Sequence, residues 1–281
     1  EAKKLQNNIE ISAWDGEWYR RAYFDDGTPL GSATNDECKI DSIAQSWSVL
    51  SKAGDKERAV TAMESAATYL IRKEQGFIQL FDPPFDKSIL NPGYIKGYVP
   101  GVRENGGQYT HAAIWLVMAF AALKNKKRTG ELLKMLNPIN RGIDEKAVAM
   151  YKVEPYVMAA DVYAEPSNLG RGGWTWYTGS AGWMYQLIIE YVLGLQRKGD
   201  ELHFDPCIPE EWTSFKIRYT YRSSVYNITF LQKRSDEQEI VIKINGIKQG
   251  QSFLQLTDDK SNQEVEIVFY ETENVQLGQL V

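Results

Sequence analysis

The hydrophobic pattern of this 281-residue chain changes its period near Asp205-Pro-Cys-Ile-Pro209, and this change constrains the fold more than any other feature. Before it, apolar residues recur three and four positions apart, which is the spacing of amphipathic helices. After it, short runs alternate apolar and polar residues and are separated by turns such as Asn245-Gly246, as antiparallel strands do. The pattern therefore predicts a mainly helical part, residues 1–205, and a β domain, residues 206–281.

Individual segments carry each of the two periods. The expected helices are Lys39–Ala53, Lys56–Arg72, Thr110–Asn125, Thr129–Leu136 and Thr178–Gln196, and the expected strands are Phe215–Tyr221, Val225–Gln232, Glu239–Ile244 and Val265–Tyr270. Between the helices lie two polar segments, 74–109 and 137–177, which are longer than the connections of a compact bundle. Their many aromatic residues favour an ordered, lined cleft over disorder.

The composition excludes several classes of protein. The 43% of hydrophobic residues suffices for a sizeable core, and a net charge of −5 without basic runs argues against nucleic acid as the main partner. Cys38 and Cys207 lack the spacing of a disulfide framework or a metal site. No apolar run is long enough for a membrane span, and no signal peptide is evident, so we expect a cytoplasmic protein. A start at Glu1 without Met suggests part of a longer or processed chain.

Two glycine-rich polar loops run directly into apolar helices. Residues 98–115 place His111, one of only two histidines, at such a junction, and residues 170–183 do the same with Thr178 and Gly179. The first turn of a helix has unpaired N–H groups and a positive dipole end, so it stabilises an oxyanion. Thr178 is expected to cap its helix, and Gly179 to allow close approach. Together they predict one phosphate site; the alternative is a plain cap and an ordinary buried histidine.

Aromatic and carboxylate side chains in the polar segments favour carbohydrate as a ligand. Sugar C–H faces stack on indole rings, and sugar hydroxyls pair with carboxylates. Trp174 and Trp176 lie in a glycine-rich loop and are ligand candidates, whereas Trp115 and Trp183 are expected to fill the helical core. The candidate carboxylates are Glu104, Glu154 and Asp161.

A set of motifs spread over nearly the whole chain carries a family resemblance. They are Trp14-Asp-Gly-Glu-Trp-Tyr-Arg-Arg-Ala-Tyr23, Gly27–Ser32, Gln45-Ser-Trp47, Pro100-Gly-Val-Arg-Glu-Asn-Gly-Gly107 with His111, Glu154-Pro-Tyr156 and Trp176-Tyr-Thr-Gly-Ser-Ala-Gly-Trp-Met184. Together these resemble the carboxy-terminal half of glycoside hydrolase family 94, which contains cellobiose and chitobiose phosphorylases. The longer runs 153–163 and 170–185, with Asp205-Pro-Cys-Ile-Pro209, most resemble the carboxy-terminal region of cyclic β-1,2-glucan synthases.

The resemblance implies a fold and a reaction. The fold is mainly α with a β domain: part of an (α/α)6 barrel followed by an antiparallel, jelly-roll-like β-sandwich. The reaction is phosphorolysis of a β-glucosidic bond with inversion, without a cofactor and with inorganic phosphate as co-substrate. The residues that the resemblance assigns to phosphate are His111, Thr178 and Gly179.

The same resemblance assigns residues to the sugar. Glu104 is similar to a glutamate that holds the donor sugar, and Tyr98 and Arg103 resemble acceptor-side residues. Asp161 resembles a donor-side polar residue. With Trp174 and Trp176, these form the expected substrate-binding set.

The family's general acid is an aspartate in a Trp-Asn-Asp stretch, and residues 1–281 contain no such stretch. Asp15 and Glu17 are acidic, but we expect them to be structural charges beside Arg20 and Arg21. The acid is therefore expected upstream in a longer polypeptide, and the isolated chain is expected to be inactive. Apolar helix faces left uncovered in a partial barrel favour self-association, such as a homodimer.

The sequence thus predicts a carboxy-terminal fragment of an inverting β-glucan phosphorylase or cyclic β-1,2-glucan synthase, a carbohydrate-active transferase. Its expected partners are a β-glucan oligosaccharide, phosphate and the upstream polypeptide, and it would lie in the cytoplasm or form the cytoplasmic part of an inner-membrane synthase. One alternative is an inverting hydrolase on the same barrel, in which Glu104 activates water. The other is a non-catalytic carbohydrate-binding module, whose ligand binding would not depend on phosphate.

Overall fold

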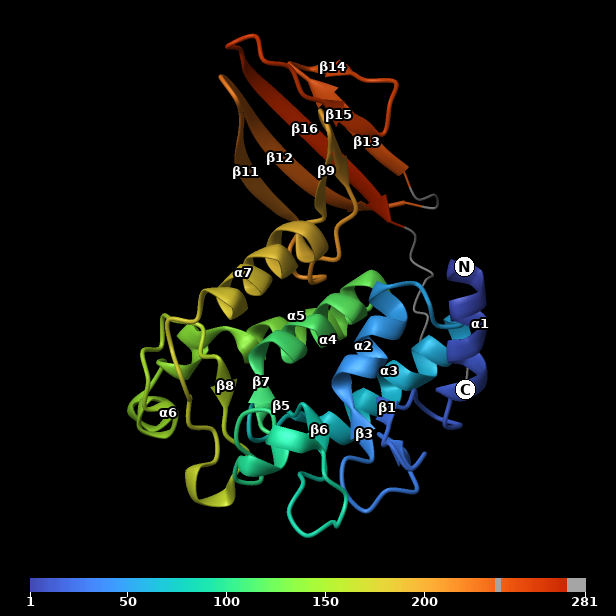
Figure 1. Ribbon diagram of the computed structural model, residues 1–281. Coiled ribbons are helices and arrows are strands. Elements are labelled where there is room, and N and C mark those ends of the chain that lie inside the picture. The colour runs from blue at the N-terminus through green and yellow to red at the C-terminus, as the bar shows by residue number, and fades with distance from the viewer. Residues whose placement is uncertain (236–238, 272–281) are drawn as a thin grey trace. The chain divides into compact units, whose positions relative to one another are not determined.

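The computed structural model describes residues 1–235 and 239–271 (Figure 1). They divide into two compact units, a first one of residues 1–124 with 128–187 and a second one of residues 125–127 with the described residues from 188 onward. The expected mixture of helices and strands is confirmed. The barrel, the sandwich and the boundary after residue 205 stay predictions, and residues 236–238 and 272–281 of the expected β domain lie outside the described part.

The α-helices occupy most of the expected helical segments. They are α1 (Ala2–Ser12), α2 (Ser42–Leu50), α3 (Lys56–Leu70), α4 (Thr110–Ala122), α5 (Lys126–Leu136), α6 (Glu145–Tyr151) and α7 (Thr178–Gln186). Helices α1 and α6 were not expected from the sequence. The expected helix to Gln196 is wrong at its end, because α7 stops at Gln186, a π-helical turn spans Leu187–Val192 and a strand begins at Leu195.

Aspartate caps fix where α2 and α3 begin. The Asp41 carboxylate accepts a hydrogen bond from the backbone N–H of Ile43 at 2.7 Å, and the Asp55 carboxylate accepts from Glu57 and Arg58 at 3.0 and 3.1 Å. Each cap pairs backbone donors that the first helical turn leaves without partners. The expected start of the first of these helices at Lys39 is therefore three residues early, because residues 40–41 form a strand instead.

Helix α4 is the central helix of the first unit. Ten of its thirteen residues are buried, and it contacts both α2 and α7. Because it is apolar on nearly every side, it belongs inside the unit and not on its surface. Its first turn, which carries His111, is thereby held by packing from two sides.

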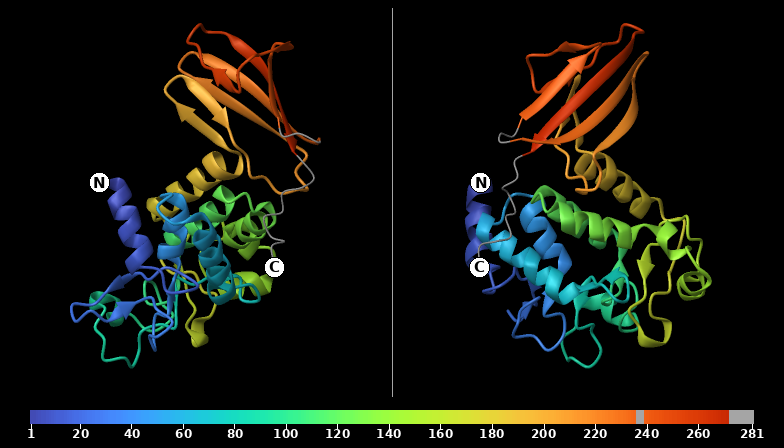
Figure 2. Two further views of the ribbon diagram at one scale, coloured as in Figure 1. Left: turned by 90° about the vertical axis from the view of Figure 1, so that its right-hand side faces the viewer. Right: turned by 180° about the vertical axis from the view of Figure 1, so that it is seen from behind.

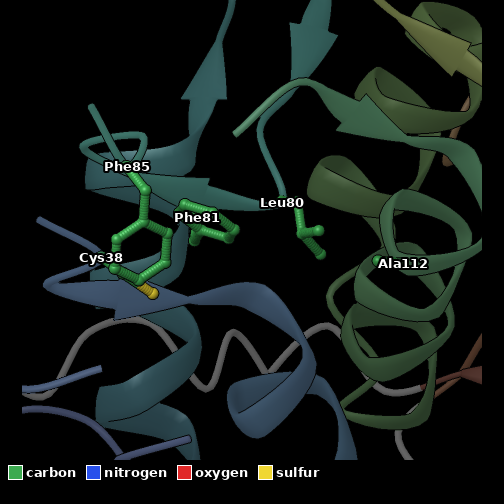
Figure 3. Close-up of a cluster of buried hydrophobic side chains, with 5 residues drawn as sticks. All are labelled: Cys38, Leu80, Phe81, Phe85 and Ala112. Carbon is green, nitrogen blue, oxygen red and sulfur yellow. The ribbon is translucent and has the colours of Figure 1, made fainter. Parts of the chain in front are cut away.

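A cluster of buried apolar side chains fixes the same helix start to the loops beneath it (Figure 3). Its members are Cys38, Leu80, Phe81, Phe85 and Ala112. The Phe81 and Phe85 rings meet edge to face with centroids 5.4 Å apart. Since Ala112 directly follows His111, this cluster determines where the histidine lies.

Four short strand pairs lie in the first unit, and three of them include strands of the long polar segments. They are β1 (Ala22–Tyr23) with β2 (Pro29–Leu30), β3 (Ile40–Asp41) with β6 (Phe81–Asp82), β4 (Ile71–Arg72) with β5 (Phe77–Ile78), and β7 (Gln108–Tyr109) with β8 (Asp161–Val162). Single turns of 3₁₀-helix lie at Gly93–Gly97, Pro138–Arg141 and Pro166–Asn168. The β7–β8 pair joins one polar segment to the other, so residues far apart in the sequence meet there.

The second unit contains two sheets (Figure 2). One has the order β15-β10-β9, with β9 (Leu195–Lys198), β10 (Glu201–Phe204) and β15 (Phe253–Gln255). The other has the order β11-β12-β16-β13-β14, with β11 (Ser214–Tyr221), β12 (Ser224–Arg234), β16 (Asn262–Glu271), β13 (Glu239–Ile244) and β14 (Ile247–Lys248). All four expected strands are present, and Asn245 and Gly246 both have the positive φ of a tight hairpin turn.

One pair of strands departs from the expected antiparallel arrangement. Strands β12 and β16 run parallel, from Val225 opposite Asn262 to Arg234 opposite Glu271. The reason is topological: β16 lies between β12 and β13, which run in opposite directions, so it must be parallel to one of them. The sheet is therefore mixed.

Candidate functional site

The start of α4 presents a histidine with an unused nitrogen. The His111 imidazole stacks on Tyr109, with centroids 5.4 Å apart and planes 20° apart, and the edge of Trp115 lies beside it. Its Nδ1 atom is buried and has no hydrogen-bond partner. Burial lowers the pKa of His111. The ring is therefore neutral near neutral pH and keeps a nitrogen for a ligand.

The start of α7 approaches this histidine directly. A Cβ atom built on Gly179 would lie only 2.6 Å from His111 Nε2, so glycine is the residue that allows the two to meet. Thr178 and Gly179 are both exposed. The expected capping role of Thr178 is wrong, because Tyr177 occupies the cap position and makes no side-chain cap bond. Thr178 is instead the first residue of the helix.

A second group of side chains gathers around Arg103. Its guanidinium carbon lies 4.7 Å from the centroid of the Trp174 ring and 5.5 Å from that of Tyr98. The Arg103 Nε atom lies 3.6 Å from a carboxylate oxygen of Glu104. Four of the residues expected to bind sugar are thus brought together, and each aromatic face in the group carries a cation.

A buried asparagine holds the loop that carries this group. The Asn105 side chain donates to the carbonyls of Phe85 and Tyr98 at 2.9 and 2.8 Å and accepts from the N–H of Phe85 at 2.8 Å. Gly101 has φ +85° and leaves no room for a side chain, since a Cβ would lie 2.5 Å from the backbone nitrogen of Glu165. The Glu-Asn-Gly-Gly motif is therefore rigid, and Arg103 itself has φ +51°.

The segment 160–164 joins the elements of the site. The N–H of Thr110 donates to Ala160 at 2.9 Å, the N–H of Ala160 donates to Trp174 at 2.6 Å, and the N–H of Ala164 donates to Gly101 at 2.7 Å. Through these bonds one short stretch sets the positions of the α4 start, the tryptophan loop and the glycine-rich loop.

Asp161, within that segment, is buried, and neither of its carboxylate oxygens accepts a hydrogen bond. The backbone of Gly173 covers it, because a Cβ on that glycine would lie 2.1 Å from Oδ1. Burial raises the pKa of Asp161, and the charge of Arg103 offsets part of the rise. The backbone of Gly173 thus covers the carboxylate, and the charge of the carboxylate still acts on Arg103.

Trp176 has a different contact from the residues of the Arg103 group. Its indole N–H donates to Glu154 Oε1 at 3.2 Å, and its side chain is 68% exposed. Its φ of +62° is unusual for a large residue and marks a constrained loop. The Glu154 pair leaves the ring with an accessible face beside the site.

Unpaired polar atoms gather in this region. Of nine buried side-chain nitrogen and oxygen atoms that lack a hydrogen-bond partner among the described residues, seven belong to the site. They are Arg103 Nε, Glu104 Oε2, Thr110 Oγ1, His111 Nδ1, Trp115 Nε1 and both Asp161 oxygens. Buried polar atoms are nearly always paired, and a polar ligand is the partner that such a cluster suits.

Some residues of the site were not expected from the sequence to take part. Tyr109 stacks on His111 and pairs with Asp161 across β7 and β8, and Tyr177 meets Trp174 edge-on. Both had been counted only as aromatics that order the polar segments. Their positions directly before the two helix starts were the available signal.

The acidic residues near the start of the chain have structural partners. Asp15 accepts hydrogen bonds from Arg20 Nε and from the N–H of Ala33, both at 2.7 Å, and also pairs with Ser32. Glu17 is exposed. Among residues 1–235 and 239–271, no group of three His, Cys, Asp or Glu side chains is arranged to bind a metal, and no helix has the length and apolarity to cross a membrane.

Known proteins match this chain over most of its length. The catalytic domain of the glycosyl hydrolase 94 superfamily matches residues 1–194, and the C-terminal domain of glycosyl hydrolase family 65 matches residues 195–246. Cyclic beta-(1,2)-glucan synthase NdvB of Rhizobium meliloti is 48% identical over 86% of this chain and 8% of its own length. Solabiose phosphorylase of Paenibacillus borealis is 29% identical over 84% of this chain and 30% of its own length. The chain thus spans less than a third of either relative.

Proposed function

Because the chain belongs to the glycosyl hydrolase 94 superfamily, we propose that it carries the phosphate- and sugar-binding side of a β-glucan phosphorylase or cyclic β-1,2-glucan synthase. Phosphate would bind at the facing starts of α4 and α7, to His111, Thr178 and Gly179. The single observation that supports this is the approach of Gly179 to His111 Nε2. The first turn of a helix offers its dipole and its unpaired N–H groups to an anion, and here an imidazole lies beside that turn.

The glucan would bind beside it, on the group around Arg103. Tyr98 and Trp174 offer aromatic faces, and Arg103 and Glu104 offer a donor and an acceptor for hydroxyls. Trp176 would extend this surface, and Asp161 would contribute through its charge. Tyr109 connects the proposed phosphate site with the group around Arg103. Its ring stacks on that of His111, and burial together with the charge of Glu104 raises the pKa of its hydroxyl.

In the proposed reaction a phosphate oxygen attacks the anomeric carbon from the face opposite the leaving sugar. The bond from that carbon to the glycosidic oxygen breaks, and the oxygen takes a proton from a carboxylic acid. The products are glucose 1-phosphate with inverted configuration and a glucan shorter by one residue. We propose that the acid comes from sequence outside residues 1–281, since these contain no Trp-Asn-Asp stretch.

Ligand binding tests the proposal without requiring turnover. Phosphate and a β-1,2-linked glucooligosaccharide are titrated separately and together into the 281-residue chain by calorimetry. We expect both to bind, and His111→Gln to weaken phosphate without weakening glucan. Glucan binding with no phosphate binding at all would favour the binding-module alternative. In the complete enzyme, release of free glucose instead of glucose 1-phosphate would favour the hydrolase.

A further inference from the structure

The buried carboxylate of Asp161 has no evident reason to exist in a stable fold. It is 1% exposed, and neither oxygen makes a hydrogen bond. A buried charge without hydrogen bonds destabilises a protein, and an uncharged residue of similar size would avoid that. Residues that break such a rule are concentrated at functional sites.

The surroundings of Asp161 exclude direct contact with a sugar. Gly173 lies against the carboxylate so closely that a Cβ would be 2.1 Å from Oδ1 and 2.6 Å from Cγ. The neighbouring Gly172 is equally confined, with a Cβ position 2.3 Å from Val153 Cγ2. The Gly172-Gly173 backbone is therefore a packed wall, and the carboxylate that Gly173 covers presents almost no surface to a ligand.

Arg103 is the cation on which this charge acts. Both groups lie against the loop that carries Trp174: the guanidinium carbon is 4.7 Å from the Trp174 ring, and the backbone of Gly173 covers the carboxylate. Each group also favours the charged form of the other. The Arg103 side chain is held between Tyr98 and Trp174, with Glu104 on its Nε side. An arginine side chain has many rotamers, and a fixed anion behind it reduces the entropy lost when it binds a ligand.

Given the proposed function, we propose that Asp161 is a positioning residue that never touches the glucan and holds the Arg103 guanidinium against Trp174 in its sugar-binding orientation. The carboxylate and the Gly172-Gly173 wall form one device. The glycines bring the carboxylate up to the back of the loop that carries Trp174. Asp161 supplies the charge, and Arg103 makes the contact with a sugar hydroxyl.

The test is a double-mutant cycle in the 281-residue chain, with Asp161→Asn as the isosteric change and Arg103→Ala as its partner. Glucan affinity is measured by quenching of tryptophan fluorescence with a β-1,2-linked glucooligosaccharide. Asp161→Asn should weaken glucan binding roughly tenfold, the size of one charge-assisted hydrogen bond. In the Arg103→Ala background the same change should have no further effect.

Two further readouts separate positioning from a structural role. Phosphate affinity should be unchanged in Asp161→Asn, and its melting temperature should be unchanged or higher, because a buried charge has been removed. A purely structural residue would lower the melting temperature and weaken both ligands. That result, or equal losses from Asp161→Asn in both backgrounds, would overturn the proposal.

Gly173→Ala provides a second variant in case Asp161→Asn does not fold. It drives a methyl group into the carboxylate and should also weaken glucan binding, whereas Gly182→Ala, with nothing within 4 Å of its Cβ position, should not. If the unchanged chain binds no glucan, the proposed function and this inference both fail. If it binds glucan and neither Asp161→Asn nor Gly173→Ala alters the affinity, only this inference fails.

Discussion

At the scale of single residues, Gly179 packs closely against the His111 ring, since a Cβ atom on this glycine would lie 2.6 Å from Nε2. Gly179 should therefore be intolerant of even one methyl group. We expect Gly179→Ala to displace the His111 ring and reduce phosphate affinity roughly tenfold or more, comparable to the loss of a charge-assisted hydrogen bond.

Gly182 in the same helix supplies the control. It has open space around its Cβ position, so Gly182→Ala should leave phosphate affinity unchanged and stabilise the protein by ~0.5–1 kcal/mol, as expected within a helix. Both variants are compared by calorimetry and thermal unfolding. Equal phosphate affinity in the two variants would remove Gly179 from the anion site.

His111 should make anion binding depend on pH. Because burial lowers its pKa, the empty protein loses stability as pH falls through the ordinary histidine range, where the unfolded chain takes up the proton more readily. A bound anion favours the imidazolium, so binding takes up a proton. We expect sulfate, which does not titrate in this range, to bind more tightly as pH is lowered from about 7.5 to about 5.5.

In His111→Gln this pH dependence should disappear. The other histidine, His203, pairs with Glu201 in the second unit and stays in place as an internal control. A pH profile for sulfate affinity that is identical in both proteins would mean that a different group titrates on binding.

The two exposed tryptophans of the glycine-rich loop, Trp174 and Trp176, should contribute unequally to glucan binding. Trp174 offers a stacking face and also supports the Arg103 guanidinium, whereas Trp176 contacts Glu154. We expect Trp174→Ala to weaken glucan binding more than Trp176→Ala, each by ~0.5–2 kcal/mol. Trp212→Ala, an exposed tryptophan of the second unit, should have no effect in the same calorimetric titration.

At the scale of secondary-structure elements, two aspartate caps allow a comparison of buried and exposed charge. Asp41 caps α2, is buried and pairs with Arg21 at 3.1 Å, whereas Asp55 caps α3 at the surface. Asp41→Ala should lower the free energy of unfolding by ~2 kcal/mol, because it leaves buried N–H groups of the first turn of α2 without an acceptor. Asp55→Ala should lower it by only ~1 kcal/mol, as for an exposed cap. Urea denaturation measures both, and equal losses would contradict this account.

Elements with a strong local signal were predictable from the sequence. The periodicity of Lys56–Arg72 and Thr110–Asn125 placed α3 and α4, and alternation gave the limits of β13. The two-residue strands such as β7 and β8 were not predictable, because they exist only through pairing between distant segments. Strand β10 is four residues long and depends on neighbours on both sides, so its own sequence says little.

The same distinction applies to the site. Helix-start chemistry indicated His111 and Gly179, which the structure places in contact distance, because that chemistry is local. The burial of Asp161 could not be predicted, since it results from the backbone of Gly173 folding over it. The pairing of Trp176 with Glu154 likewise depends on a loop conformation with positive φ.

At the scale of the whole molecule, the proposal implies a division of catalytic work. We expect the 281-residue chain, given phosphate and a β-1,2-glucooligosaccharide, to release negligible glucose 1-phosphate. General acid catalysis alone contributes ~10²–10⁴-fold to such reactions. Joining the chain to the upstream segment that we propose should restore the release of glucose 1-phosphate, as measured by a coupled assay. Turnover on the order of 1 s⁻¹ by the chain alone would mean that a carboxylate within it serves as the acid.

The position of β16 has a consequence for how the second unit forms during synthesis. The strand lies between β12 and β13 and pairs with both, yet it is the last strand of the sheet to leave the ribosome. Until then β11–β12 and β13–β14 are two separate hairpins, each with an open edge, and isolated hairpins are barely stable in water. Their backbone amides should therefore gain protection from hydrogen exchange together, in one late step that waits for residue 262 and beyond.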